Sequence, residues 1–272
     1  TDMGTGCDTI IAQFAADVLE TPIDNISVYG VDTDISPYDS GSYASSTTYL
    51  TGMAAVKACE QLRERIIALA AVRMNKDAST LTFDGENVID ESDGAKMSLF
   101  DIATASMCNN EISLEVTYSH SSPVSPPPFM AACAEIEADP ETGAIELLDY
   151  TACVDCGTVV NTNLARVQTE GGLLQGIGMT LYEDVWYNEK GVNLSNSLMQ
   201  YKIPTRLDFD KIRVEFESSY EPTVPFGAKS IGEIVINTPA PAIAQAVYNA
   251  TGVWVNELPI TPEKILKGMH VI

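Results

Sequence analysis

Two polar stretches near the start of the sequence hold residue types that bind anions. The turn Gly4-Thr5-Gly6 directly precedes a stretch with helical spacing. Backbone N–H groups of such a turn can approach an anion, and the helix dipole favours negative charge there. Hydroxyl side chains that could donate hydrogen bonds to a phosphate or a pterin follow at Ser40, Ser42, Ser45, Ser46, Thr47, Thr48 and Thr51. Both stretches also suit plain structural roles, as a helix entry capped by Asp8 or Thr9 and as a turn whose hydroxyls bond locally.

A single glutamate late in the sequence could serve as a general base. Glu233 ends the run Lys229-Ser230-Ile231-Gly232-Glu233, which follows a loop containing Pro222, Pro225 and Gly227. A carboxylate held on such a loop and partly removed from water can accept a proton from a reacting group. A solvated surface glutamate is the alternative, because most glutamates are exposed.

The cysteines and histidines form no recognisable catalytic or metal-binding motif. Cys153 and Cys156 have C-x-x-C spacing, but the sequence has no second closely spaced pair to complete a zinc or iron–sulfur site. An offset of three also points the two side chains to opposite faces of a strand, which predicts packing roles. The only histidines, His120 and His270, lack the nucleophile elbow of a serine hydrolase. We therefore predict no metal-ligating residue.

The composition excludes several classes of partner. Of the 272 residues, 45% are hydrophobic, which is enough for a packed core. The formal net charge of −23 excludes recognition of nucleic acid or an anionic membrane through a broad electrostatic field. The longest apolar run, Ile66–Val72, is far shorter than the ~20 residues of a membrane helix, and the start has no signal-peptide pattern. Six cysteines make no disulfide framework in so long a chain, so we expect reduced thiols and a soluble, cytoplasmic protein.

These candidate residues must be positioned by a mixture of helices and hairpins. Hydrophobic periodicity, caps and turns predict an α+β fold with mixed β-sheets and long packed helices. Helices are expected over 8–19, from near Thr47 to near Asn75, from the Ser98 cap through Met107, over 164–182, over 239–251 and after the Thr261 cap. Strands are expected over 26–31, 112–118, 130–138 and 144–154, with a hairpin over 81–88 and a further hairpin turn at 188–191.

A proline-rich segment predicts the division of the chain into two lobes. The run from Ser121 to Pro128 contains three consecutive prolines, which lack the N–H donors that a sheet needs. We therefore expect a first lobe over 1–122 and a second lobe, carrying Glu233, over 129–272.

In order and spacing, these motifs resemble the C-terminal molybdenum-cofactor-binding region of the xanthine dehydrogenase/aldehyde oxidoreductase family of molybdenum hydroxylases. The resemblance covers nearly the whole chain. It rests on Met3–Gly6, Asp32–Asp34 with Gly41–Thr48, Asp155–Gly157 with Asn161, Gln168–Gly172 with Gln175–Gly178, Tyr201–Thr205 and Gly227–Glu233. Two positions depart from the family pattern: Thr5 stands where relatives commonly have Gln, and Ser46 where many bacterial relatives have Arg.

The resemblance implies a fold with two lobes of a cofactor-binding domain and a role for each matching residue. It makes Glu233 the active-site base of a hydroxylation at an electron-poor carbon, with oxygen derived from water. It also implies a molybdenum–molybdopterin cofactor, as such or as a dinucleotide. The residues implied to hold this cofactor are Gly4, Thr5, Gly6, Ser45, Thr47, Thr48, Gln168, Lys229, Ser230 and Gly232.

The same resemblance implies that this chain acts with partners. The upstream half of the family's molybdenum-binding region is missing, and the sequence begins without a methionine. We therefore expect a segment or subunit that works with that half and with iron–sulfur and flavin (FAD) subunits. The run Lys229–Glu233 resembles anaerobic bacterial xanthine-dehydrogenase-like sequences, which favours a purine or another N-heteroaromatic substrate. An aldehyde substrate, a non-catalytic cofactor carrier or assembly module, and an acidic interaction domain stay open as alternatives.

Overall fold

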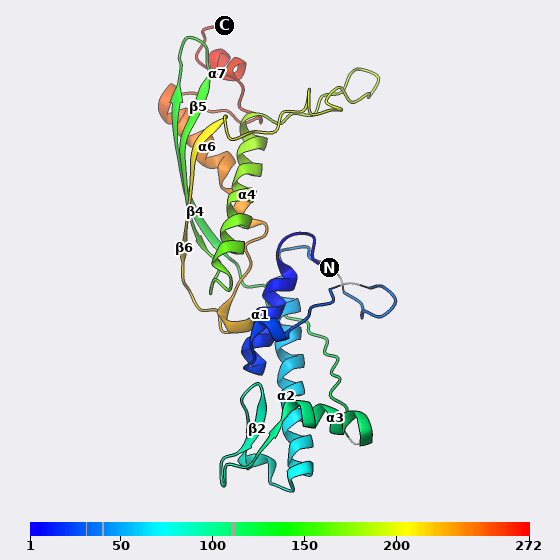
Figure 1. Cartoon of the computed structure of the whole chain (residues 1–272). Helices are drawn as coiled ribbons and strands as arrows, with labels where there is room; N and C mark the ends of the chain where they lie inside the picture. The colour runs from blue at the N-terminus through cyan, green and yellow to red at the C-terminus, as the bar shows by residue number, and fades with distance from the viewer. Residues whose placement is uncertain (31, 40, 110–111) are drawn as a thin grey trace. The chain divides into compact units, whose positions relative to one another are not determined.

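A computed structural model of the chain describes residues 1–30, 32–39, 41–109 and 112–272 (Figure 1). Its Cα trace forms two compact units. Unit 1 comprises Thr1–Pro126 and Glu221–Lys229, and unit 2 comprises Pro127–Tyr220 and Ser230–Ile272. The chain thus returns to unit 1 for one short segment late in the sequence. The cofactor-binding lobes over 1–122 and 129–272 stay a prediction, which did not include this return.

Two helices form the framework of unit 1. Helix α1 (Cys7–Leu19) packs against helix α2 (Gly52–Met74). A π-helical turn, Thr47–Thr51, directly precedes α2. Asn75 ends α2 in the left-handed conformation, with a φ of 52°. The helices predicted at 8–19 and from near Thr47 to near Asn75 are therefore confirmed.

A small antiparallel sheet shares one core with α2. Its strands are β1 (Leu81–Phe83), β2 (Asn87–Asp90) and β3 (Lys96–Ser98), in that order, and α3 (Leu99–Asn109) follows. The hairpin and the helix after Ser98 are confirmed, since Ser98 Oγ accepts a hydrogen bond from the Asp101 N–H at 3.1 Å. The shared core consists of Ile66, Leu69, Ala70, Leu81, Phe83, Val88 and Ile102.

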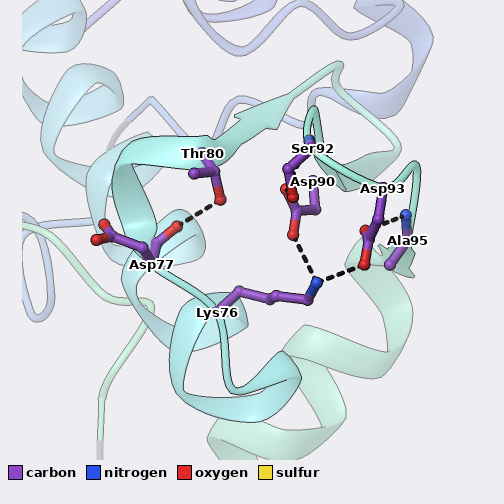
Figure 2. Close-up of polar contacts among 7 residues, drawn as sticks. All are labelled: Lys76, Asp77, Thr80, Asp90, Ser92, Asp93 and Ala95. Atoms are coloured by element: carbon purple, nitrogen blue, oxygen red, sulfur yellow. Dashed lines mark hydrogen bonds and ion pairs between the residues drawn. The ribbon is translucent and has the colours of Figure 1, made fainter.

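A buried carboxylate links this sheet to Lys76, two residues after the end of α2. Asp90 is 1% exposed and accepts hydrogen bonds from the N–H and hydroxyl of Ser92 at 2.9 and 2.7 Å. Lys76 Nζ lies 2.9 Å from Asp90 Oδ2 and 2.5 Å from Asp93 Oδ2 (Figure 2). The hydrogen bonds from Ser92 and Lys76 hold the pKa of Asp90 well below its usual range. The carboxylate is therefore charged and paired at neutral pH.

Two predicted strands of unit 1 are wrong. Residues 26–30 form no strand, and Val31 lies outside the described residues. Gly30 instead lies against Asp8, whose Oδ1 would be 2.8 Å from an added Cβ. Residues 112–118 form no strand either; Arg65 Nη1 donates to the carbonyls of Ser113 and Glu115 in this segment.

Unit 2 is built on a three-stranded sheet. Strands β4 (Phe129–Ala138) and β5 (Ile145–Asp155) are antiparallel, as predicted, and Gly143 turns between them with a φ of 73°. Strand β6 (Phe209–Glu217), which was not predicted, pairs with β5 in parallel. The sheet order is therefore β4-β5-β6.

Helices α4 (Thr162–Leu181) and α6 (Pro239–Thr251) pack on this sheet and on each other (Figure 1). Helix α4 connects β5 to β6, which makes one parallel crossover. Helix α7 (Pro262–Gly268) is capped by Thr261, whose Oγ1 accepts from the Lys264 N–H at 3.3 Å. All three predicted helices are confirmed. The core of unit 2 consists of Leu147, Tyr150, Ala152, Leu173, Ile177, Phe209, Val214, Ile243, Val247, Ile260 and Ile265.

Between α4 and β6 the chain makes a long excursion (Figure 1). The predicted turn at 188–191 is confirmed by a hydrogen bond from the Asn188 N–H to the Val192 carbonyl, at 3.0 Å. The remaining short helical elements are η1 (Ile23–Asn25), η3 (Ala78–Thr80), η4 (Pro225–Gly227) and α5 (Ile234–Asn237). Helices and small sheets in this mixture confirm the predicted α+β class.

Candidate functional site

A turn in an uncommon backbone conformation leads into the hydroxyl cluster of unit 1. Ala44 and Ser45 have φ values of 52° and 54°, which non-glycine residues rarely adopt. Ser46 is buried, and its hydroxyl donates to the Tyr43 carbonyl at 2.8 Å. The π-helical turn begins directly afterwards, at Thr47. Both features occur preferentially at functional sites.

Three of the predicted cofactor contacts offer unpaired polar groups. The side chains of Thr47 and Thr48 in unit 1 are half-buried, as is Gln168 on α4 of unit 2. Within the described part of the chain, neither hydroxyl and no atom of the Gln168 amide makes a hydrogen bond. Uncharged donors of this kind suit a ligand rich in nitrogen and oxygen acceptors.

The glycine-rich turn before α1 already holds an anionic group of its own. The Asp2 carboxylate accepts hydrogen bonds from the N–H groups of Gly4, Thr5 and Asp8 at 2.8, 3.0 and 3.2 Å. These backbone bonds lower the pKa of Asp2 against the opposing effect of its partial burial, which is the largest single influence. Gly4 and Gly6 have φ values of 97° and 84°, and nothing lies within 4 Å of an added Cβ at Gly4. The turn thus has the anion-binding geometry that was expected, with Asp2 as its occupant.

The segment that returns to unit 1 is anchored by aromatic contacts. Phe226 stacks on Phe14 of α1 with ring centroids 5.6 Å apart, and its φ of 51° is left-handed. Gly52, at the start of α2, makes room for this packing, because an added Cβ would lie 2.6 Å from Phe14 and 3.3 Å from Pro225. Lys229, the last residue of the segment, is buried.

In unit 2, glycines of α4 let the residues after Glu233 pack closely on this helix. Gly172 lies against Val235, the second residue of α5. Gly176, one turn later, lies against Pro239, the first residue of α6. The later glycine of α4 contacts the later residue of the second segment, so α4 and α5 run in the same direction.

This register gives the location of Glu233 relative to Gln168. Gln168 lies one turn before Gly172 and on the same face of α4. Glu233 lies two residues before Val235 and directly precedes α5. Both residues therefore lie at the same end of the α4–α5 pair.

A buried tyrosine fixes the other end of α5. The Tyr150 hydroxyl donates to Thr238 Oγ1 at 2.9 Å, and Thr238 joins α5 to α6. Tyr150 is fully buried on β5, and this burial raises its pKa to about 12. The α5–α6 junction is thus held to the sheet by a neutral hydrogen bond.

The residues around Glu233 differ in exposure. Ser230 is 6% exposed. Gly232 and Glu233 are exposed in this chain. The partial desolvation expected of Glu233 is therefore not supplied by this chain alone.

Each unit holds its own share of the predicted site. Unit 1 contains Gly4, Thr5, Gly6, Ser45, Thr47, Thr48 and Lys229, and unit 2 contains Gln168, Ser230, Gly232 and Glu233. The roles of these residues stay predictions. The sequence analysis did not predict that the Asp2 carboxylate binds the N–H groups of the glycine-rich turn. It also did not predict that Val235 packs against Gly172, although the glycines of α4 are evident in the sequence.

The packing role predicted for Cys153 and Cys156 fits only Cys156. Cys153 is exposed and Cys156 is buried, which agrees with opposite orientations along one strand and its end. In the described residues, no three His, Cys, Asp or Glu side chains lie together in a way that could hold a metal ion.

Comparison with known proteins identifies the family. A model of the molybdopterin cofactor-binding domain matches residues 1–210. The chain belongs to the molybdopterin cofactor-binding domain family. Two relatives from Escherichia coli K12 support membership of the molybdenum hydroxylases: the probable hypoxanthine oxidase XdhD is 37% identical, and the putative xanthine dehydrogenase molybdenum-binding subunit XdhA is 32% identical, each over 100% of this chain. The predicted family resemblance is thereby confirmed.

A solved structure agrees with this assignment and with the fold. The Cu,Mo-CO dehydrogenase matches 100% of the chain with a TM-score of 0.88 and 26% identity. The chain spans 28% of the length of XdhD, 37% of XdhA and 35% of the dehydrogenase chain. Every helix in the described ranges is too short or too polar to cross a membrane.

The polar groups of the chain fit a molybdopterin cofactor. Within unit 1, Thr47 and Thr48 offer hydroxyl donors, and within unit 2, Gln168 offers an amide donor; groups of this kind match an acceptor-rich pterin. The turn at Gly4 holds a carboxylate and can hold another anionic oxygen only if Asp2 is displaced. These observations support the family assignment with residues of this chain.

Proposed function

We propose that this chain is the segment of a molybdenum hydroxylase that binds one part of the molybdopterin cofactor and supplies the catalytic base. The observation that carries the proposal is the packing of α5 on α4, because it brings Glu233 and Gln168 to the same end of two adjacent elements. Family membership supports the cofactor, and the shared end of α4 and α5 supports the proposal that Glu233 acts close to Gln168.

Four of the residues proposed to hold the cofactor, Thr47, Thr48, Gln168 and Ser230, have side chains that make no hydrogen bond within the described residues. Thr47 and Thr48 would donate from the start of α2, and Gln168 and Ser230 from unit 2. Gly4, Thr5, Gly6, Ser45, Lys229 and Gly232 complete the set that the family motifs imply. Lys229 would add the positive charge that an anionic cofactor needs in so acidic a chain.

Glu233 would accept the proton that hydroxylation releases. When bound, the cofactor supplies the two-electron oxidation of a substrate carbon. The chain supplies a carboxylate at a fixed position and the donors that orient its surroundings. Because Glu233 is exposed in this chain, we propose that the remaining part of the enzyme covers it.

The relatives favour a purine or another N-heteroaromatic substrate. The names of XdhD and XdhA refer to hypoxanthine and xanthine, both of which are purines. An aldehyde is the second candidate. Partner chains with iron–sulfur clusters and FAD would carry the electrons away, and the cytoplasm is the proposed location.

The test uses the full complex purified from its native host. Hypoxanthine, xanthine, nicotinate and a set of aldehydes would be assayed with an artificial electron acceptor, together with molybdenum analysis. We expect turnover of one of the heteroaromatic compounds, and a loss of about 10²–10⁴-fold in kcat on Glu233→Gln with unchanged molybdenum content. Glu217→Gln, an exposed carboxylate on β6, is the matched control and should keep the wild-type rate.

Three outcomes would contradict the proposal in different ways. Turnover of aldehydes alone would replace the substrate class. A wild-type rate for Glu233→Gln would remove the assigned base, and delivery of cofactor to another enzyme without turnover would favour a carrier. Absence of molybdenum from the native complex would favour an acidic interaction domain.

A further inference from the structure

Two glycines of α4 occupy positions where any side chain would collide with the segment after Glu233. An added Cβ at Gly172 would lie 2.1 Å from Val235 Cγ2 and 3.0 Å from Val235 Cβ. At Gly176 it would lie 2.6 Å from Pro239 Cγ and 3.0 Å from the Ile236 carbonyl oxygen. Real Cβ atoms do not approach other atoms so closely, so a larger residue must displace α5.

The groups that these glycines face cannot move aside independently. Val235 is 2% exposed, and its β-branched side chain has few accessible rotamers. Pro239 is a rigid ring, and the Ile236 oxygen belongs to the backbone. On the far side, the hydrogen bond from Tyr150 to Thr238 holds the α5–α6 junction to the sheet. Strain introduced at Gly172 therefore has to displace α5, which Glu233 directly precedes.

A neighbouring glycine shows that this is a property of the two positions and not of the helix. Gly171 lies on the same turn of α4, yet nothing is within 4 Å of an added Cβ there. Glycine costs about 1 kcal/mol relative to alanine inside a helix. At Gly172 and Gly176, the close approach of the segment after Glu233 explains why glycine is present despite this cost.

We infer that Gly172 and Gly176 are positioning residues for Glu233: the absence of side chains at these sites lets α5 seat on α4 and so sets the location of the carboxylate. This inference rests on the proposed function, in which Glu233 is the base. It extends that function to residues that touch neither substrate nor cofactor. A displacement of about 1 Å at a reacting group can lower a rate about 10²-fold.

The test is Gly172→Ala in the full complex, with Gly171→Ala as the matched control and Val235→Ala as the compensating change. We expect Gly172→Ala to lower kcat about 10²-fold while KM and molybdenum content stay within about twofold of wild type. Gly171→Ala should behave as wild type. Gly172→Ala combined with Val235→Ala removes the colliding methyl groups and should recover at least tenfold of the lost kcat.

A second readout does not depend on catalysis. In thermal unfolding, Gly172→Ala should lower the midpoint, and the added Val235→Ala should lower it less than Val235→Ala does in the wild-type background. If Gly172→Ala does not assemble, Val235→Ile adds a methyl group to the same contact and must also lower kcat.

The outcomes separate this inference from the proposed function. A wild-type kcat for Gly172→Ala, or a loss that Val235→Ala does not restore, overturns the inference even if Glu233→Gln is inactive. A wild-type rate for Glu233→Gln overturns the proposed function, whereas the coupling in unfolding would remain.

Discussion

The ring of Phe14 fills the space that a side chain at Gly52 would need: an added Cβ would lie 2.6 Å from Phe14 Cε2. Phe14 is 1% exposed and cannot swing away. Gly52→Ala should therefore overpack unit 1 at a cost of ~1–3 kcal/mol, partly offset by the ~1 kcal/mol gain in helix propensity. We expect a net loss of up to about 2 kcal/mol in the free energy of unfolding, measured in urea. A gain in stability would show that α1 and α2 can separate without cost.

Tyr150→Phe should weaken unit 2 by removing the hydrogen bond to Thr238. The loss should be about 1–2 kcal/mol, because the Thr238 hydroxyl loses its oxygen partner and keeps only Met130 Sδ, 3.6 Å away. Burial raises the pKa of Tyr150 from 10.0 to about 12, so its contribution is complete below pH 10 and is lost as the pH rises to about 12. Unfolding free energies of wild type and Tyr150→Phe over this range should converge. A constant difference would contradict the assignment.

Asp90→Asn should make the stability of unit 1 less sensitive to acid. Hydrogen bonds from Ser92 and Lys76 hold the pKa of Asp90 far below its ordinary 3.8. The stability that they provide is therefore present above about pH 4 and is lost as the pH falls through the folded-state pKa. Thermal midpoints between pH 7 and pH 2 should fall less steeply in Asp90→Asn, from a lower starting value. Asp93→Asn, at a half-exposed partner of Lys76, is the control and should keep most of the wild-type slope.

Thr47→Val and Thr48→Val should affect the cofactor and leave the fold unchanged. Neither hydroxyl bonds to the described protein, so the unfolding free energy should change by less than about 0.5 kcal/mol. A lost hydrogen bond of ~0.5–1.5 kcal/mol corresponds to roughly a 2- to 10-fold weaker hold on the cofactor. Molybdenum and pterin content under limiting supply would reveal it. Thr82→Val, at an exposed position of β1, should retain full content, and equal retention by all three variants would exclude the two hydroxyls as contacts.

The helices could be predicted from sequence because their signals are local. Ser98 and Thr261 cap helices through their own side chains, and Gly252 ends α6 with a φ of 76°. The hairpins were predicted for the same reason, since Gly143 sets a turn wherever the strands pair. Such features depend on residues within one or two turns of each other.

The strand predictions failed where strand formation depends on residues that are distant in the sequence. Residues 112–118 have strand-like spacing, yet the Arg65 side chain takes carbonyls in that segment. Strand β6 has alternating Ile212, Val214 and Phe216 and was missed, because its partner β5 lies more than fifty residues earlier. Which segments pair into a β-sheet therefore depends on the tertiary fold and not on the local sequence alone.

For the candidate site, sequence motifs located the residues but not their surroundings. Glu233 was singled out from its motif, and the sequence left open whether it is partly desolvated or exposed, as it is in this chain. The paired glycines of α4 were visible, yet nothing in the sequence indicates that Val235 lies against one of them. Likewise, Asp2 was not expected to occupy the turn at Gly4.

The late return of residues 221–229 to unit 1 has a consequence for synthesis. During translation, Phe14 and Gly52 emerge long before Pro225 and Phe226 exist to pack against them. Unit 1 therefore receives its last segment only after most of unit 2 has been synthesised. A nascent chain stalled before residue 225 would lack the ring of Phe226 that stacks on Phe14.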